Sequence, residues 1–321
     1  MSSQESEKIP KKYLIHICEL YEINTKDLTF VGGFENIIYS FQKNNQECFL
    51  RIGDSKHMTF ELVQAELDWV SYLVENDVPA IKPTKSVKKR ILEKINTDDG
   101  YFNVVVFEKA IGQHLDRRNP QNWSDEIIKE YGRITGKMHA LSKKYEAKEE
   151  KRYHFKPSMD IKWLLKDGDK ETINRISKLF QEVDNLPKEK ESYGLVHADL
   201  HTSNFFVEND KITAVLDFDR TCYKWFVSEI AVALYYPLHL SHLNQDRKSQ
   251  EEFVKRFLPL FMRGYEEENK LDSEWMKKLN IFIQVRDIVL FMYLPKDFRK
   301  NLRPRILGKE SYVDVQKIAG Y

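Results

Sequence analysis

The sequence predicts an α+β fold with a small β-rich N-terminal domain and a larger, mainly helical C-terminal domain. In the first hundred residues, short runs of β-branched and aromatic residues are each bounded by turn-forming residues. After Gly112, apolar residues recur every three or four positions over long stretches, as on the buried face of a helix. We therefore assign residues 1–108 to the first domain and residues 109–321 to the second.

The first domain is expected to combine a sheet with two helices. Apolar residues at helical spacing indicate the helices, and the Asp99-Gly100 step is a strong turn signal for a β-hairpin. The expected elements are a helix at 13–21, strands at 28–31, 37–41 and 48–52, a helix at 57–74, and a hairpin of strands at 88–95 and 101–107.

The second domain is expected to be helical around one central hairpin. The long helical stretches fall at 124–143, 172–183, 250–268 and 274–293. Arg286 lies among apolar residues in the last of these and needs an anionic partner, because a buried unpaired charge is costly. That anion is either a structural carboxylate or a group on the substrate.

Composition argues for a soluble cytoplasmic protein. The formal net charge of +1 on 321 residues gives no electrostatic reason to expect nucleic acid or a membrane surface as partner. Residues 1–7 are polar and lack the apolar core of a signal peptide. The cysteines are few and widely spaced, which favours free thiols in a reducing compartment: Cys18, Cys48 and Cys222.

The most informative stretch runs from residue 195 to residue 219. Apolar runs at 205–207 and 212–216 flank a polar, turn-like cluster and indicate a β-hairpin. A turn centred between Asp210 and Lys211 would place Asn204 opposite Asp217. Directly opposed residues in an antiparallel pair lie about 5 Å apart.

This juxtaposition predicts a phosphotransferase. The amide oxygen of Asn204 and the carboxylate of Asp217 could together hold Mg²⁺, which prefers oxygen ligands and shares them with substrate phosphates. Asp199, on the loop before the hairpin, is free to accept a proton and is the expected catalytic base.

These residues carry a family resemblance. The segment His197-Ala-Asp-Leu-His-Thr-Ser-Asn204, followed by Asp217-Phe-Asp, resembles the catalytic loop and metal-binding motif of the aminoglycoside phosphotransferase/choline kinase superfamily. The residues that follow Asp217 are most similar to those of the homoserine-kinase-like bacterial branch. The resemblance implies a two-lobed protein-kinase-like fold, ATP or GTP as phosphoryl donor, Mg²⁺ as cofactor, and a small molecule with a hydroxyl group as acceptor.

In the first domain, the resemblance assigns residues to donor binding. Gly32 and Gly33 form a turn where kinases cover the nucleotide phosphates. Arg51, at the end of the third strand, replaces the usual phosphate-binding Lys and offers a bidentate fork. Glu66 lies on the buried side of the following helix and is the expected partner of Arg51.

The resemblance also places the adenine-binding hinge at the end of the last strand of this domain. Adenine would hydrogen-bond to backbone groups there, so side-chain identity carries little information. The implied hinge residues are Phe107, Glu108, Lys109 and Ala110.

Candidates for the acceptor site are Asp219 and Trp225. The face of Trp225 could hold an ammonium group, or the ring could simply pack the helix that follows. Glu229 stands where the family usually has Asp and is expected to brace the catalytic loop. His197 is expected to orient that loop by hydrogen bonding.

Two alternatives compete with a kinase. The Asp217-x-Asp219-x-Thr221 pattern also fits a haloacid-dehalogenase-like phosphatase that uses Asp217 as nucleophile, but that fold needs alternating strands and helices after Thr221, where long helices are expected. A degraded kinase that only binds nucleotide is the other, and intact Asp199, Asn204 and Asp217 argue against it. The acceptor is left open among homoserine, other amino alcohols, sugars, aminoglycosides and protein hydroxyls.

Overall fold

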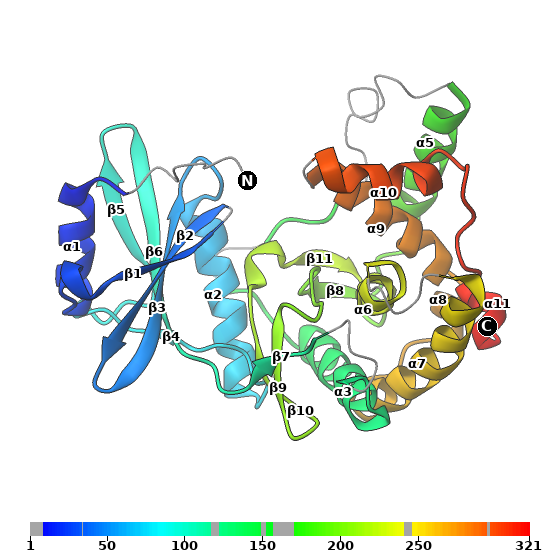
Figure 1. Cartoon of the computed structure of the whole chain (residues 1–321), viewed down its shortest axis with the longest axis horizontal. Helices are drawn as coiled ribbons and strands as arrows, with labels where there is room; N and C mark the ends of the chain where they lie inside the picture. Colours follow the sequence, from blue (N-terminus) through cyan, green and yellow to red (C-terminus); the bar gives the residue numbers. More distant parts are fainter. Residues whose placement is uncertain are drawn as a thin grey trace. The chain divides into compact units, whose positions relative to one another are not determined.

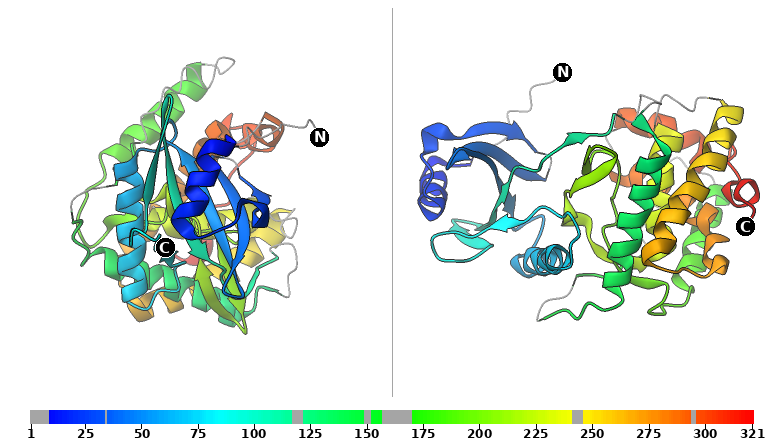
Figure 2. Two further views of the ribbon diagram at one scale, coloured as in Figure 1. Left: turned by 90° about the vertical axis from the view of Figure 1, so that its left-hand side faces the viewer. Right: turned by 90° about the horizontal axis from the view of Figure 1, so that it is seen from below.

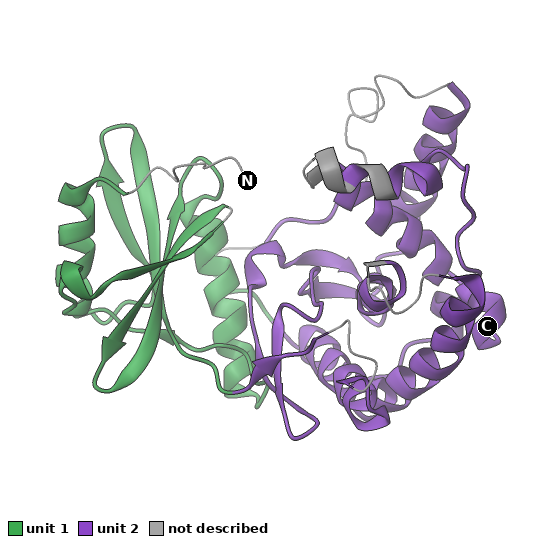
Figure 3. Cartoon of the chain, in the orientation of Figure 1, with its two compact units in different colours: residues 1–111, 146–151 green, residues 112–145, 152–321 purple. Residues whose placement is uncertain are grey.

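The computed structural model describes residues 9–33, 35–116, 122–148, 152–156, 170–240, 246–293 and 296–321. The chain forms two compact units (Figure 3), one made of residues 1–111 and 146–151 and the other of residues 112–145 and 152–321. Within the described ranges, no helix has both the length and the apolar character needed to cross a membrane.

The first unit is an antiparallel sheet with a helix on each face (Figures 1 and 2). The strand order is β1-β2-β3-β6-β4, and β5 pairs with β6. The elements are α1 (Lys11–Tyr21), η1 (Thr25–Asp27), β1 (Thr29–Gly32), β2 (Asn36–Lys43), β3 (Gln46–Asp54), α2 (Phe60–Glu75), β4 (Pro83–Thr84), β5 (Glu93–Thr97) and β6 (Gly100–Glu108).

Strand β6 explains why both faces of this sheet are covered. Successive side chains of a strand point to opposite faces, and Val104, Val105 and Val106 are all buried. Val104 and Val106 pack in one core cluster with residues of α1. Val105 packs in another with residues of α2. A continuous apolar run in β6 therefore corresponds to a central strand between two helices.

The second unit is mainly helical. Its strands form two small antiparallel groups, β10-β9-β7 and β11-β8. The elements are β7 (Gln113–His114), α3 (Asp125–Ser142), α5 (Lys170–Asp184), β8 (Tyr193–Val196), β9 (Phe205–Glu208), β10 (Lys211–Val215), η3 (Phe218–Arg220), β11 (Cys222–Trp225), α6 (Phe226–Tyr235), η4 (Tyr236–Leu240), α7 (Arg247–Glu268), α8 (Ser273–Met276), α9 (Leu279–Tyr293), α10 (Lys296–Ile306) and α11 (Val315–Ala319).

Most predicted elements are present, with local differences at their ends. The helix expected from residue 57 begins at Phe60, because the Thr59 hydroxyl accepts the Leu62 N–H as an N-cap. The strand expected from residue 88 begins only at Glu93, since residues 86–90 form a turn in which Lys89 has a left-handed φ of 62°. The helix expected at 274–293 is two helices, α8 and α9.

Helices α3 and α7 approach so closely that glycine is required at their contact. A Cβ on Gly132 would lie 1.8 Å from the carbonyl oxygen of Phe261, and a Cβ on Gly264 would lie 1.8 Å from that of Lys129. Neither backbone oxygen can move without displacing its helix. The contact also fixes α3, which carries a histidine that supports the catalytic loop.

We predict that Gly132→Ala destabilises the protein. Overpacking of a tight contact typically costs about 1–3 kcal/mol, and the cost should exceed the gain of about 1 kcal/mol from the better helix propensity of Ala. Urea denaturation at a fixed temperature measures the change. Lys255→Ala, at an exposed position of α7, is the control and should change the free energy of unfolding by less than about 0.5 kcal/mol. Equal stability of Gly132→Ala and the wild type would contradict the close contact.

Candidate active site

The loop between β8 and β9 carries Asp199 and is held by Glu229. The backbone N–H groups of His197 and Ala198 donate to the two carboxylate oxygens of Glu229, at 3.2 and 2.7 Å. Ala198 has a left-handed φ of 67°, a conformation that costs a non-glycine residue about 1–3 kcal/mol. The charge-assisted hydrogen bonds to Glu229 offset that cost.

Glu229 lies fully buried on α6 and receives a third hydrogen bond from α3. The Asn269 amide donates to the Tyr265 hydroxyl oxygen at 2.7 Å, so this hydroxyl is free to donate to His139 Nδ1 at 2.9 Å. His139 Nε2 then carries the hydrogen and donates to Glu229 at 3.1 Å. Burial lowers the pKa of His139, although Glu229 opposes the shift. The chain of bonds is therefore consistent with a neutral imidazole.

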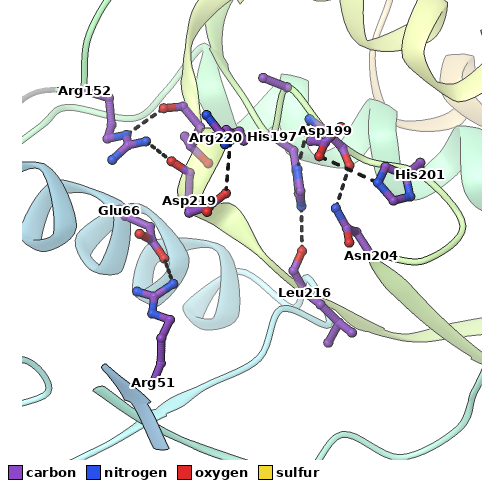
Figure 4. A network of polar contacts seen from close by, with 12 residues as sticks. Arg51, Glu66, Arg152, His197, Asp199, His201, Asn204, Leu216, Asp219 and Arg220 are labelled. Carbon is purple, nitrogen blue, oxygen red and sulfur yellow. Dashed lines mark hydrogen bonds and ion pairs between the residues drawn. The ribbon is translucent and has the colours of Figure 1, made fainter. Parts of the chain in front are cut away.

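His197 connects the catalytic loop to the strand that precedes Asp217. Its Nε2 donates to the carbonyl oxygen of Leu216 at 2.8 Å, and its Nδ1 accepts the N–H of Asp199 at 3.3 Å (Figure 4). Both ring nitrogens are thus used to fix backbone groups. The expectation that His197 orients the loop by hydrogen bonding is confirmed.

The predicted hairpin is present, but its turn lies one residue earlier than expected. Asn209 and Asp210 both adopt left-handed φ angles, 51° and 57°, and connect Glu208 to its partner Lys211. Such a two-residue turn suits the twist of an antiparallel pair.

A β-bulge between Ile212 and Ala214 then shifts the pairing by one residue. As a result the Leu216 N–H donates to the Asn204 carbonyl oxygen at 2.8 Å. Asn204 therefore lies opposite Leu216, and the prediction that it directly opposes Asp217 is wrong by one position. Asp217 is the next residue along.

The side chains of Asn204 and Asp217 retain oxygen atoms suited to a cation. The Asn204 amide nitrogen donates to the Asp199 carbonyl oxygen at 2.9 Å, which fixes the orientation of the side chain (Figure 4). Asp217 has a left-handed backbone, with φ 59° and ψ 64°, that turns the chain from β10 into η3. No hydrogen bond or ion pair reaches the Asp217 carboxylate from the described part of the chain. These oxygens fit a hard cation that completes its shell with phosphate oxygens.

The carboxylate of Asp199 lies beside a buried arginine. Arg286, on α9, forms an ion pair with its Oδ1, and the Tyr236 hydroxyl donates to the same oxygen at 3.2 Å. His201 Nε2 lies 3.7 Å from Oδ2, and the His201 ring stacks on Tyr236. Burial by itself would raise the pKa of Asp199, but Arg286, together with His201 and His197, holds it well below its ordinary range.

Sequence reasoning identified Arg286 as a charge that needs an anion but did not identify Tyr236. The anion is Asp199, so the charge is paired within the chain. Tyr236 begins a π-helical turn, η4, at the end of α6. Such turns are frequent at functional sites. The signal in the sequence that could have indicated this turn is the step Tyr235-Tyr236-Pro237.

Of the two acceptor-site candidates, one lies in the core. Trp225 is fully buried, and its Nε1 donates to the Pro187 carbonyl oxygen at 2.8 Å. The ring packs against Tyr193 and Phe282, so the structure favours the alternative in which it packs the protein interior. Asp219 is also buried, with 9% of the residue exposed.

The turn that contains Asp219 is held by Arg152. The Arg152 guanidinium donates to the carbonyl oxygens of Asp219 and Thr221, the latter at 2.6 Å (Figure 4). The Asp219 carboxylate lies 3.9 Å from Arg220 Nε. Arg152 is itself buried.

In the first unit, the predicted pair of Arg51 and Glu66 is confirmed. Arg51 Nη1 donates to Glu66 Oε1 at 2.8 Å (Figure 4), and the Glu66 side chain is only 2% exposed. The guanidinium also lies over the ring of Phe107, 5.2 Å from its centroid. The pair links β3 to α2.

The remaining predicted donor-site residues of this unit lie at strand ends. Gly32 ends β1 and Gly33 follows it, with φ angles of 144° and 140°, and a Cβ on Gly33 would lie 1.7 Å from the Asn36 carbonyl oxygen. Phe107 and Glu108 end β6, and Lys109 and Ala110 follow it. Lys109 Nζ pairs with Glu47 at 2.8 Å.

The fold excludes the phosphatase alternative. Every pairing between the named strands is antiparallel. The described residues after Trp225 belong to helices and their connections. A haloacid-dehalogenase-like enzyme would require strands in this part of the chain.

Comparison with known proteins gives a consistent result. Residues 28–273 match the phosphotransferase enzyme family. The chain is 31% identical over 306 residues to amicoumacin kinase from Bacillus subtilis (strain 168), an alignment that covers 94% of this chain and 87% of that protein.

Solved structures show the same fold. An amicoumacin kinase in complex with AMP-PNP, Ca²⁺ and Ami is similar with a TM-score of 0.83 and 26% sequence identity, over 95% of this chain and 96% of that one. A microcompartment-associated aminopropanol kinase is similar with a TM-score of 0.67 and 19% identity, over 91% and 93% of the two chains. The predicted kinase-like α+β fold is confirmed.

We predict that acid destabilises the protein partly through His139. Burial lowers its pKa in the folded state from an ordinary value of 6.5, so below that pH the unfolded chain binds a proton that the folded chain does not. Stability should therefore fall as the pH drops from about 6.5 toward the lowered pKa. His139→Gln keeps an N–H donor for Glu229 but cannot titrate, and should flatten this dependence.

Thermal midpoints measured from about pH 5 to about pH 8 test this prediction. The matched control is His16→Gln, which makes the same substitution at an exposed position of α1. If His139→Gln and the wild type lose stability with the same slope, His139 is not the group responsible.

Proposed function

The chain belongs to the phosphotransferase enzyme family and is an ATP-dependent small-molecule kinase, and we propose that its acceptor is amicoumacin or a close chemical relative of it. The observation that carries this proposal is the 31% identity to amicoumacin kinase over 94% of the chain. The TM-score of 0.83 to a second amicoumacin kinase supports it. The proposal narrows the predicted acceptor from any small molecule with a hydroxyl group to amicoumacin and its close chemical relatives.

The proposal includes Mg²⁺ as the cation that accompanies ATP. Asn204 and Asp217 would hold it through their side-chain oxygens, and it would neutralise negative charge on the donor phosphates. The hydrogen bond from the Asn204 amide nitrogen to the Asp199 carbonyl oxygen presets the first of these ligands. A cytoplasmic location also belongs to the proposal, since Cys18, Cys48 and Cys222 are all free thiols.

Asp199 is the proposed catalytic base. Its lowered pKa keeps the carboxylate ionised, so it can accept a hydrogen bond from the acceptor hydroxyl and orient the attacking oxygen. Phosphoryl transfer proceeds mainly through positioning and charge stabilisation, which places little demand on the strength of the base. Asp219, whose side chain is 13% exposed, is proposed to contact the acceptor.

Arg51 is the proposed ligand of the donor phosphates. Its guanidinium stays charged and provides a planar fork, and Glu66 holds it in place through the ion pair of 2.8 Å. Gly32 and Gly33 are proposed to let the β1–β2 loop approach the phosphates. The backbone of residues 107–110 is proposed to bind adenine.

A panel of hydroxylated acceptors, assayed by ADP production with Mg²⁺ and ATP, tests the acceptor. Amicoumacin should give the highest kcat/KM among amicoumacin, homoserine, aminopropanol and an aminoglycoside. A higher kcat/KM with another acceptor would overturn the proposed acceptor but not the kinase activity.

Asp199→Asn should lower turnover by roughly 10²–10⁴, the usual contribution of a positioned base, with nucleotide affinity changed only a few-fold. Near-wild-type turnover of this variant would overturn the assignment of Asp199 as the catalytic base.

We also predict that Arg51 and Glu66 act as one unit. Arg51→Ala removes the phosphate contact, and Glu66→Ala releases Arg51, so the double variant should be little worse in kcat/KM than the worse single variant. Arg51→Lys should keep partial activity, because the charge remains and the fork is lost.

The exposed pair of Lys12 and Asp98, with Nζ 2.8 Å from Oδ2, provides the control for this cycle, since it lies in the same unit and outside the proposed donor site. Its alanine variants should leave kcat/KM nearly unchanged. If the losses at Arg51 and Glu66 multiply instead, the two residues contribute independently and the assigned pairing has no role in donor binding.

A further inference from the structure

The two carboxylate oxygens of Asp199 have different surroundings. Oδ1 receives both the Arg286 guanidinium and the Tyr236 hydroxyl. The nearest described donor to Oδ2 is His201 Nε2 at 3.7 Å, beyond ordinary hydrogen-bond distance. The Asp199 side chain is 24% exposed, so Oδ2 is the oxygen that retains its hydrogen-bonding capacity.

Arg286 is fixed by several contacts at once. The same terminal nitrogen, Nη2, donates to Asp199 Oδ1 and to the Tyr236 hydroxyl oxygen, and Nη1 donates to the Ala198 carbonyl oxygen at 3.4 Å. The guanidinium also lies 5.1 Å from the centroid of the Tyr236 ring. Only 8% of Arg286 is exposed, and a cation at such a place is costly unless it is paired. These contacts hold the carboxylate and the backbone of the catalytic loop together.

Tyr236 completes a closed set of three polar groups. Burial raises its pKa to about 12, so the phenol keeps its proton and can donate to Asp199 while accepting from Arg286. The π-helical turn that starts at Tyr236 brings its hydroxyl to the catalytic loop. Each of the three side chains restrains the other two.

We propose that Arg286 and Tyr236 are positioning residues that hold Oδ1 of Asp199, so that Oδ2 alone receives the acceptor hydroxyl. The proposal rests on the proposed function, in which Asp199 is the base. Fixing one oxygen prevents the carboxylate from rotating about its terminal bond and defines the direction in which the hydroxyl hydrogen points. Misplacement of a reacting group by about 1 Å can cost roughly 100-fold in rate, so the restraint acts on kcat.

Four variants test this role. Arg286→Gln should lower kcat by roughly 10- to 100-fold and leave the KM for ATP within a few-fold, because in the described part of the chain no hydrogen bond or ion pair joins Arg286 to Asn204 or Asp217. Arg286→Lys should recover part of the loss, since it restores the charge without the fork. Tyr236→Phe removes a single hydroxyl and should lower kcat by roughly three- to ten-fold. In an Asp199→Asn background, Arg286→Gln should cause almost no further loss.

The matched control is Arg305→Gln. Arg305, on α10, forms a buried ion pair with Asp287, the residue after Arg286 on α9, with Nε 2.8 Å from Oδ2. Among the described residues, no hydrogen bond or ion pair joins Arg305 to Asp199. Its loss should lower stability and leave kcat per folded enzyme unchanged, at a temperature where every variant is folded.

Two results would overturn the proposal while leaving the kinase function intact. One is wild-type kcat in both Arg286→Gln and Tyr236→Phe. The other is a loss from Arg286→Gln that is as large in the Asp199→Asn background as in the wild type. Near-wild-type turnover of Asp199→Asn itself would contradict the assigned base, and the positioning role would fall with it.

Discussion

Glu229 accepts the backbone N–H groups of His197 and Ala198 from a fully buried position on α6, and the imidazole of His139 is a third donor to it. A carboxylate without solvent is tolerated only when its oxygens receive hydrogen bonds. The backbone N–H groups likewise need a buried acceptor. The Glu229 carboxylate and the two backbone N–H groups therefore supply each other with the hydrogen-bond partner that a buried polar group needs. These bonds stabilise the left-handed conformation of Ala198.

From this anchor, hydrogen bonds extend through the rest of the site in a defined order. His197 joins the loop to Leu216, the Leu216 N–H bonds to the Asn204 carbonyl oxygen, and the Asn204 amide returns to the Asp199 carbonyl oxygen. These bonds hold the proposed base and the proposed cation ligand Asn204 in place, which reduces the cost of organising them during the reaction.

The sequence predicted the parts of this arrangement that local chemistry decides. Glu66 on an apolar helix face required a cation, and Arg51 is that cation. The register of the hairpin was missed because its turn lies one residue earlier than expected. The bulge near Thr213, which leaves no compositional mark, moves the partner of Asn204 back only to Leu216. Trp225 was ambiguous, since an aromatic residue beside a motif can either bind a ligand or pack the core, and only tertiary burial distinguishes the two. Tyr236 was missed because its contact with Asp199 spans 37 positions.

The contrast between two neighbouring carboxylates separates structural from functional polar groups. Asp287 is fully buried, and both of its oxygens are saturated: Tyr235 and Arg305 donate to Oδ1, and Arg305 and Tyr312 donate to Oδ2. Asp199 is partly exposed and is saturated on one oxygen only.

Tyr235 donates to Asp287 and the next residue, Tyr236, donates to Asp199, while Arg286, which pairs with Asp199, directly precedes Asp287. The hydrogen bond from Tyr235 to Asp287 thus joins the end of α6 to α9, beside the two residues that hold Asp199. Full saturation immobilises a carboxylate, whereas saturation of one oxygen orients it and leaves the other able to bind. The incomplete hydrogen bonding of Asp199 is thus the feature that distinguishes a reacting group from a brace.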